Sequence, residues 1–313
     1  MALADAQGSY GRADWFRART GAVRTSLGSV PPPALILLGI VSVQVGAGLA
    51  KNLFARSSPD AIVMMRLLTS AVVLGVAYRS ALRDLRRLHS WRDIGVATLF
   101  GLTLAGMNFS FYQALARLPL GVAVTIEFLG PLAVSILASR RRLDLVWALL
   151  ALGGVALLAR GGGGVTLTGV AFALLAAAGW ATYIVMSGAT GRRFSGSSGL
   201  AVASIVGAVV MLPAGIGTAG TKLLDPELLL VAAGVGLLSS VIPYSLEIEA
   251  LRRVSARLFG ILMSMEPAVG ALVGLVFLGE VLQWREWLAI GLVIAACVGA
   301  TRFQPSPPGV PEA

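Results

Sequence analysis

Long apolar runs separated by short polar segments extend through most of the chain. A helix needs about 20 mostly apolar residues to cross ~30 Å of hydrocarbon. Segments of about that length span residues 34–55, 60–79, 93–116, 119–138, 143–159, 168–189, 198–217, 227–251, 256–278 and 285–302. Turn and N-cap residues at 57–60 and 224–227 separate neighbouring runs. The pattern predicts an all-α polytopic membrane protein with ten transmembrane helices.

The composition agrees with this pattern. Of the 313 residues, 57% are hydrophobic and 13% are charged, whereas a soluble domain is about 25% charged. Residues 1–33 lack the apolar core of a cleavable signal peptide and end in three prolines, so we expect a disordered cytoplasmic tail. We expect a second disordered tail at the proline-rich residues 303–313. The composition lies far outside the class of soluble domains and predicts a multi-pass membrane protein.

Lys and Arg are distributed unevenly over the successive loops. With the N-terminus in the cytoplasm, the cytoplasmic segments hold 18 Lys and Arg and the outer segments hold 5. The positive-inside rule predicts this asymmetry for ten spans with both termini in the cytoplasm. The net charge of +10 is therefore spread over loops at the membrane edge and does not indicate a partner among nucleic acids.

The two halves of the chain carry similar features in the same order. Shifting the sequence by 136 positions sets residues 114–117 on 250–253 and Pro131 on Pro267. Each proline removes a backbone donor inside an apolar run, which lipid tolerates only where the break faces protein or a water-filled cavity. The copies begin five spans apart, an odd number, so they would lie in opposite orientations. We predict two inverted five-helix repeats, residues 34–160 and 168–302.

Two acids and two bases fall in the otherwise apolar core of the predicted spans. Glu127 and Glu266 lie near mid-membrane. Arg66 lies about two turns into the second span, and Lys51 lies near the outer end of the first. A charge at the bilayer centre costs roughly 2.5–3.5 kcal/mol, so it normally faces a cavity or a partner and marks a functional path.

We predict that these four residues and three uncharged polar residues in the spans bind substrate. The predicted substrate-binding residues are Glu127, Arg66, Lys51, Gln44, Glu266, Asn108 and Tyr112.

Each charged residue also has a structural interpretation. The long side chains of Lys51 and Arg66 could reach the lipid headgroups. Glu127 is too short for that and would otherwise be a structural partner of a basic residue. Glu266 precedes a proline and could be engaged at the helix break. These alternatives stay open at the level of the sequence.

Other polar and aromatic residues are interpreted structurally. Glu247 and Glu249 fall near the cytoplasmic end of the eighth span, where we expect them at the interface. We expect Asp60 to cap the second span. Trp180 and Tyr183 could line a cavity, but aromatic residues at helical spacing more often serve packing.

Soluble-enzyme motifs are not found in the sequence. Residues 161–164 form a glycine run without the lysine and serine or threonine of a phosphate-binding loop. A single cysteine, Cys297, and a single histidine, His89, do not make a metal site. We expect no catalytic residues, no metal and no cofactor, so transport would be driven by a gradient or run downhill.

Several stretches carry a family resemblance. They are residues 42–54, Met65-Arg66-Leu67, Glu127-Phe128-Leu129-Gly130-Pro131-Leu132, Trp180-Ala181-Thr182-Tyr183-Ile184, Ser264-Met265-Glu266-Pro267-Ala268 and Phe277-Leu278-Gly279-Glu280. These stretches resemble the EamA family of the drug/metabolite transporter superfamily, and within it the threonine/homoserine exporter type. The resemblance implies ten helices in two inverted repeats, a central cavity, and proton-coupled or exchange-type efflux of small metabolites.

The leading hypothesis is a secondary transporter of the inner membrane that exports small amino acids such as threonine or homoserine, by proton antiport or exchange. Arg66 or Lys51 would bind the substrate carboxylate. Glu127 or Glu266 would bind its ammonium group or exchange a proton. Its partners would be a small-molecule substrate, protons and the lipid bilayer.

Two alternatives remain. The first is efflux of another small metabolite or of a cationic drug. The second is a membrane enzyme that acts on lipid-linked substrates, which would need clusters of Asp or His in loops at one face of the membrane. The sequence shows no such clusters.

Paired substitutions distinguish a zwitterionic substrate from a cationic one. Export of a zwitterion should fall by about tenfold or more in both Glu127→Gln and Arg66→Gln, because each loses a hydrogen bond to a charged group. Export of a cation should need Glu127 alone. Uptake of the labelled compound into everted membrane vesicles measures both. Transport of a zwitterion that survives both substitutions would contradict the residue assignment.

Overall fold

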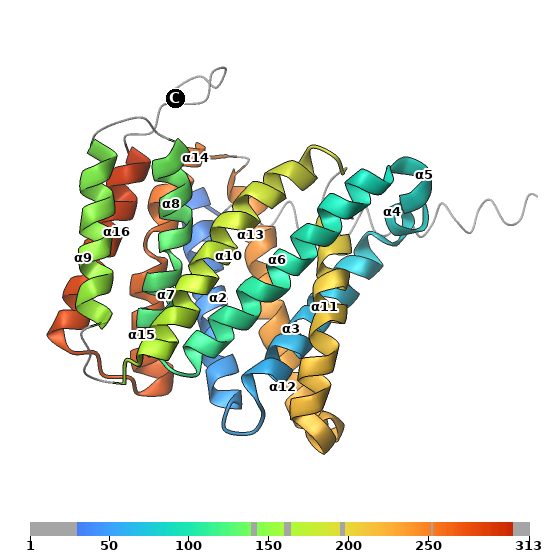
Figure 1. Cartoon of the computed structure of the whole chain (residues 1–313), viewed down its shortest axis with the longest axis horizontal. Helices are drawn as coiled ribbons and strands as arrows, with labels where there is room; N and C mark the ends of the chain where they lie inside the picture. The colour runs from blue at the N-terminus through green and yellow to red at the C-terminus, as the bar shows by residue number, and fades with distance from the viewer. Residues whose placement is uncertain (1–29, 139–142, 160–163, 195–197, 252, 303–313) are drawn as a thin grey trace, which may run out of the picture.

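The structure, a computed structural model, describes residues 30–138, 143–159, 164–194, 198–251 and 253–302 (Figure 1). Nearly all of the predicted tail 1–33 and all of 303–313 lie outside the described residues. Within these ranges the chain forms helices and no strands. The helices are α2 (Pro32–Leu53), α3 (Pro59–Ala77), α4 (Arg79–Arg83), α5 (Leu85–Leu88), α6 (Trp91–Leu115), α7 (Leu120–Glu127), α8 (Leu129–Ala138), α9 (Leu143–Ala159), α10 (Leu167–Gly191), α11 (Ser198–Ala219), the 3₁₀ turn η1 (Gly220–Leu224), α12 (Pro226–Gly236), the π-helical turn η2 (Leu237–Val241), α13 (Ile242–Leu251), α14 (Ala256–Met263), α15 (Glu266–Leu278) and α16 (Trp284–Arg302).

The helices agree with the predicted spans to within a few residues. Nine helical segments of the described chain are long and apolar enough to cross a membrane. The remaining predicted span, 143–159, is α9, an apolar helix of 17 residues, shorter than the ~20 residues that a span needs. The protein is therefore an all-helical, multi-pass membrane protein, while the tenth span and the inverted repeats stay predictions.

Local chemistry sets where the helices begin. At α3 the Ser58 side chain accepts a hydrogen bond from the backbone N–H of Ala61 at 3.1 Å, and Pro59 occupies the first turn. The interpretation of Asp60 as the cap was wrong, because Ser58 takes that position. The Asp60 carboxylate instead accepts a hydrogen bond from the side-chain amide of Gln113 and so joins α3 to α6.

Two spans are interrupted near their middles, as their prolines predict. The fourth span breaks at Phe128 between α7 and α8, three residues before Pro131. The ninth breaks at 264–265 between α14 and α15, directly before Glu266 and Pro267. Each break places a glutamate at a helix end inside the bundle, Glu127 as the last residue of α7 and Glu266 as the first of α15.

A third break, which the sequence interpretation did not include, lies between α12 and α13. Pro243 has no N–H, so it cannot donate to the backbone oxygen of Ser239 four residues earlier. The chain widens there into η2, where the N–H of Ile242 reaches the oxygen of Leu237. Such π-helical turns occur frequently at functional sites.

The helix packing places α2 at the centre of the bundle. It contacts α12, η2, α13, α14 and α15, while α6 packs against α10 and α11, and α9 against α16 (Figure 1). Glycines allow the closest approaches. A Cβ at Gly46 would lie 2.3 Å from the Ser239 hydroxyl, and one at Gly121 would lie 2.6 Å from the Cα of Ala271. Small residues thus bring α2 against η2 and α7 against α15.

The contact of α7 with α15 gives a stability prediction. Gly121→Ala should destabilise the protein by about 1–3 kcal/mol, because the new methyl group meets the backbone of Ala271 and the helices must separate. Gly106→Ala is the matched control, since a Cβ at this helical glycine meets no atom within 4 Å. Thermal unfolding of the purified protein in detergent measures both. Equal melting temperatures for the two variants would contradict the proposed tight crossing.

Candidate functional site

The two ends of the bundle differ in charge. One face holds α4, α5 and the end of α10, and its arginines include Arg79, Arg83, Arg192 and Arg193 (upper side of Figure 1). We call it the basic face. The other end, called the opposite face, holds the end of α2, the end of α11 and the beginning of α12.

A central cavity with a volume of about 180 Å³ lies between the two faces. It is lined by side chains from α2, α3, α6, α7, α10, α14 and α15 and from the η2–α13 segment. The lining residues are Val43, Gln44, Ala47, Arg66, Met107, Asn108, Phe111, Glu127, Trp180, Tyr183, Ser239, Pro243, Glu247, Met263 and Glu266.

The central cavity brings together most of the predicted substrate-binding residues. Gln44, Arg66, Asn108, Glu127 and Glu266 all line it, although they come from five different helices. Of the predicted set, Lys51 and Tyr112 are not among the described residues of the lining. Trp180 and Tyr183, which the sequence interpretation favoured as packing residues, do line it.

Arg66 is fixed by the break in the neighbouring span. Its Nη2 donates a hydrogen bond to the backbone oxygen of Ser239 at 3.2 Å, the oxygen to which Pro243, having no N–H, cannot donate. The guanidinium also lies over the Tyr112 ring, 5.6 Å from its centroid. Its Nε is buried and has no acceptor among the described protein atoms. Arg66 is thus held from two sides with donor capacity left.

Glu266 and Gln44 form a buried pair across the cavity wall. The Gln44 amide donates to one Glu266 oxygen at 3.0 Å. The second Glu266 oxygen and the Gln44 side-chain oxygen are buried without a partner in the described protein. Buried polar atoms normally have a partner, so these two atoms are candidates for contact with a polar ligand.

Glu127 and Glu266 occupy different electrostatic environments. Glu266 lies in the first turn of α15, where the helix macrodipole and free N–H groups attract an anion. Glu127 ends α7, where free carbonyl groups attract a cation. The described residues provide no ion pair to Glu127, although Arg66 lines the same cavity. The two carboxylates are therefore suited to different tasks.

Glu247 was misjudged from the sequence, which placed it at the interface. It lines the central cavity, and a Cβ at Gly39 of α2 would lie 3.8 Å from its carboxylate. The sequence interpretation judged Glu247 by its nearness to the end of the span. That criterion failed because a second cavity extends along this part of α13. Glu249 behaves as expected for an end of a span, since it pairs with Arg253 at 2.5 Å.

The second cavity has a volume of about 340 Å³ and lies between the central cavity and the basic face. Its lining includes Phe259 and Gly260 near the beginning of α14, and Thr301 near the end of α16. We call it the basic-side cavity. The two cavities share Trp180, Glu247 and Met263.

Lys51 joins three helices near the opposite face. Its ammonium group pairs with Glu280 at 2.6 Å and donates to the backbone oxygen of Leu118. The other Glu280 oxygen accepts a hydrogen bond from the N–H of Leu120 at 2.7 Å. This cluster connects the end of α2 with the loop after α15 and with the beginning of α7.

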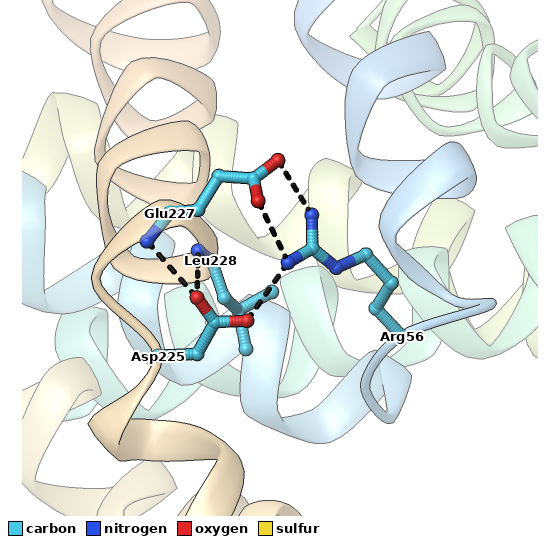
Figure 2. A network of polar contacts seen from close by, with 4 residues as sticks. All are labelled: Arg56, Asp225, Glu227 and Leu228. Carbon is cyan, nitrogen blue, oxygen red and sulfur yellow. Dashed lines mark hydrogen bonds and ion pairs between the residues drawn. The ribbon is translucent and has the colours of Figure 1, made fainter.

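A second ionic network lies at the same face, as Figure 2 shows. Arg56 donates to Asp225 at 2.8 Å and to Glu227 at 2.8 and 3.2 Å, and Asp225 also caps α12 through the N–H groups of Glu227 and Leu228. The N–H of Leu228 and the Arg56 guanidinium hold the pKa of Asp225 below its ordinary value. The two carboxylates raise the pKa of Arg56. The network ties the α2–α3 loop to the beginning of α12.

The described residues include no group of three His, Cys, Asp or Glu side chains that could hold a metal ion. The arrangement is that of a small polar binding site in a membrane bundle, with one guanidinium and three carboxylates around it.

Known proteins resemble this chain over most of its length. Residues 167–302 match the EamA-like transporter family. The threonine/homoserine exporter RhtA of Escherichia coli (strain K12) is 39% identical over 274 residues, which cover 86% of this chain and 91% of the exporter. The exporter of the same name from Salmonella typhimurium (strain LT2) is 39% identical over 277 residues, with the same coverage. A solved structure described only as the crystal structure of a protein has a TM-score of 0.56 at 20% identity and covers 88% of this chain and 99% of its own, which supports the fold alone.

The Arg56 network gives a pH prediction. Arg56→Gln should lower the melting temperature at neutral pH, because it removes the ion pairs of Arg56 with Asp225 and Glu227. The decrease should be small, because the pair with Asp225 is exposed. The folded-state pKa of Asp225 is lowered, so its contribution is present above the unfolded pKa of about 3.9 and is lost as the pH falls through the folded value. The difference in melting temperature between the parent and Arg56→Gln should therefore become smaller below about pH 4. Lys222→Gln, at an exposed cation of the same face, is the control, and an unchanged difference at about pH 3 would refute the linkage.

Proposed function

The chain belongs to the EamA-like transporter family and is a transporter rather than an enzyme. From this premise we propose that it exports small amino acids such as threonine or homoserine by secondary transport. The curated relatives that are 39% identical to it are named as threonine/homoserine exporters. We place it in the inner membrane.

The observation that carries this proposal is that one small cavity has both a hydrogen-bond donor and hydrogen-bond acceptors without partners in the described protein. The buried Nε of Arg66 is a donor, and the buried oxygens of Gln44 and Glu266 are acceptors. An amino-acid zwitterion has a carboxylate that can accept a hydrogen bond from Arg66, and an ammonium group that can donate to the oxygens of Gln44 and Glu266. The cavity of about 180 Å³ is smaller than the roughly 300–1,000 Å³ of drug-sized sites, which favours a small metabolite.

The proposed role of each residue follows from the groups that surround its side chain. Arg66 binds the substrate carboxylate, because its guanidinium is already oriented by Ser239 and Tyr112. Glu127, at the carbonyl end of α7, binds the ammonium group together with the unpartnered oxygens of Gln44 and Glu266. Asn108 faces the same cavity and can contribute an amide oxygen, although its nitrogen is engaged with the Leu104 oxygen at 2.8 Å.

We propose that transport is coupled to protons or proceeds by exchange. Glu266 is the proposed proton carrier, since one of its oxygens is buried without a partner in the described protein. A carboxylate that binds either a proton or the substrate ammonium links the two fluxes. Lys51, which joins three helices away from the central cavity, is assigned to closing the opposite face rather than to binding substrate.

The proposed topology places the basic face in the cytoplasm, with both termini on that side. In this orientation the basic-side cavity admits substrate from the cytoplasm, while the Lys51 and Arg56 networks hold the helices together at the outer face. We assign α9 as a tenth, short span, which makes residues 34–160 and 168–302 the two inverted five-helix repeats. Alternating access would then proceed by rocking of one repeat against the other.

A second candidate function is efflux of an organic cation. Three carboxylates and one guanidinium line the central cavity, and this excess of acidic groups favours a positively charged substrate. The amino-acid proposal remains the first choice, because a cation leaves the free donor of Arg66 unused.

Everted membrane vesicles test the proposal, since they turn the cytoplasmic face outward. Labelled threonine should accumulate when the vesicle interior is acidified, because protons leaving through the transporter drive the amino acid in. A protonophore should lower the accumulation if protons are coupled, and leave counterflow against unlabelled threonine intact. Vesicles without the protein are the background. Uptake no higher than this background, for threonine and homoserine alike, would overturn the proposal.

A further inference from the structure

Glu247 lies where the two cavities meet. Of the three residues that line both cavities, Trp180, Glu247 and Met263, it alone carries a charge. It belongs to α13, which follows the π-helical turn, and the other two belong to α10 and α14. These three side chains form the shared boundary of the basic-side cavity and the central cavity.

The Glu247 carboxylate has capacity for a ligand. It is partly buried and lines both cavities, yet within the described chain no hydrogen bond or ion pair engages it. Its neighbour on the same helix differs, because Glu249 is paired with Arg253. A structural glutamate in a membrane bundle is expected to have such a partner, so Glu247 lacks the usual explanation.

The surroundings of Glu247 fit a substituted ammonium group. The charged groups that face the central cavity from other helices are Glu127, Glu266 and Arg66. Trp180 lines both cavities together with Glu247, and its ring makes a T-shaped contact with Phe128, with the ring centroids 5.0 Å apart. A carboxylate next to an indole is a common environment for an organic cation, through a charge-assisted hydrogen bond and a cation–π contact.

We propose that Glu247 is the first contact of the substrate's ammonium group on the way in from the basic face, and that it selects amine-bearing molecules before they reach the central cavity. The inference rests on the proposed export of amino acids and adds a specificity-determining residue to that site. The ammonium group would move from Glu247 to Glu127, while Arg66 takes the carboxylate.

Substrate kinetics in everted vesicles test this assignment. Glu247→Gln should raise the KM for labelled threonine by about tenfold, the change expected on losing one hydrogen bond to a charged group, with a smaller change in kcat. Glu247→Asp keeps the charge and should stay nearer to the parent. Glu249→Gln is the matched control on the same helix and should leave the KM unchanged.

Competitors separate recognition of the amine from recognition of the carboxylate. Ethanolamine carries an ammonium group without a carboxylate, so it should inhibit the parent and lose potency in Glu247→Gln. N-acetylthreonine carries a carboxylate without an ammonium group, so it should inhibit the parent poorly and gain relative to ethanolamine in the variant. Equal losses for both competitors would indicate a general distortion and would overturn the assignment.

The outcomes distinguish this inference from the proposed function. If the parent transports threonine and Glu247→Gln has an unchanged KM, the role of Glu247 is refuted and the transport function stands. If the parent transports neither threonine nor homoserine, both proposals fail. If Glu247→Gln does not fold, as shown by thermal unfolding, Glu247→Asp decides: a KM as high as that of a Glu247→Ala variant would refute selection by charge.

Discussion

The hydrogen bond from Arg66 to the backbone oxygen of Ser239 is the contact on which the central cavity depends. An arginine inside a membrane bundle needs an acceptor, and a buried backbone carbonyl that has lost its usual helical donor needs a donor in return. Pro243 lacks the N–H that would engage Ser239, and the chain widens into a π-helical turn at that point. The oxygen is thereby available at 3.2 Å from the guanidinium. Gly46 allows α2 to approach the same turn, so one break in one span orients both the cation of the site and the wall opposite it.

The two other breaks supply the acidic side of the cavity. Each places a glutamate at a helix end within the bundle, but at ends of opposite polarity: Glu127 lies at the carbonyl end of α7 and Glu266 at the N–H end of α15. In the predicted repeats their prolines correspond, while the glutamates do not occupy equivalent places. This asymmetry supports the division in which Glu127 receives the ammonium group and Glu266 exchanges a proton. Discontinuous helices of this kind are the usual way in which membrane transporters bring backbone charge to a midplane site.

The charged residues outside the central cavity have a separate purpose. Lys51, Glu280 and the backbone around Leu118 and Leu120 join three helices near the opposite face, and Arg56 joins the α2–α3 loop to α12 nearby. These contacts connect segments that would have to separate if substrate left on that side. The cavities, by contrast, extend toward the basic face, and Glu247 lies at their junction. The distribution is consistent with a bundle that receives substrate at the basic face, which is the arrangement that an exporter requires before it changes state.

The sequence by itself determined the class of the protein and most of its spans, because lipid demands long apolar segments and leaves a strong one-dimensional signal. It also singled out Glu127, Glu266 and Arg66, since charge inside such a segment is costly and therefore conspicuous. Only the tertiary structure decided which of these residues meet. Lys51 has the same sequence signal as Arg66, yet it pairs with Glu280 away from the cavity, because side-chain partners from distant helices are not encoded in local hydropathy. Glu247 was predicted to lie outside the site, yet it lines the cavity. Its position near the end of a span suggested the interface, and only the packing of α10, α13 and α14 around a second cavity brought it into the site.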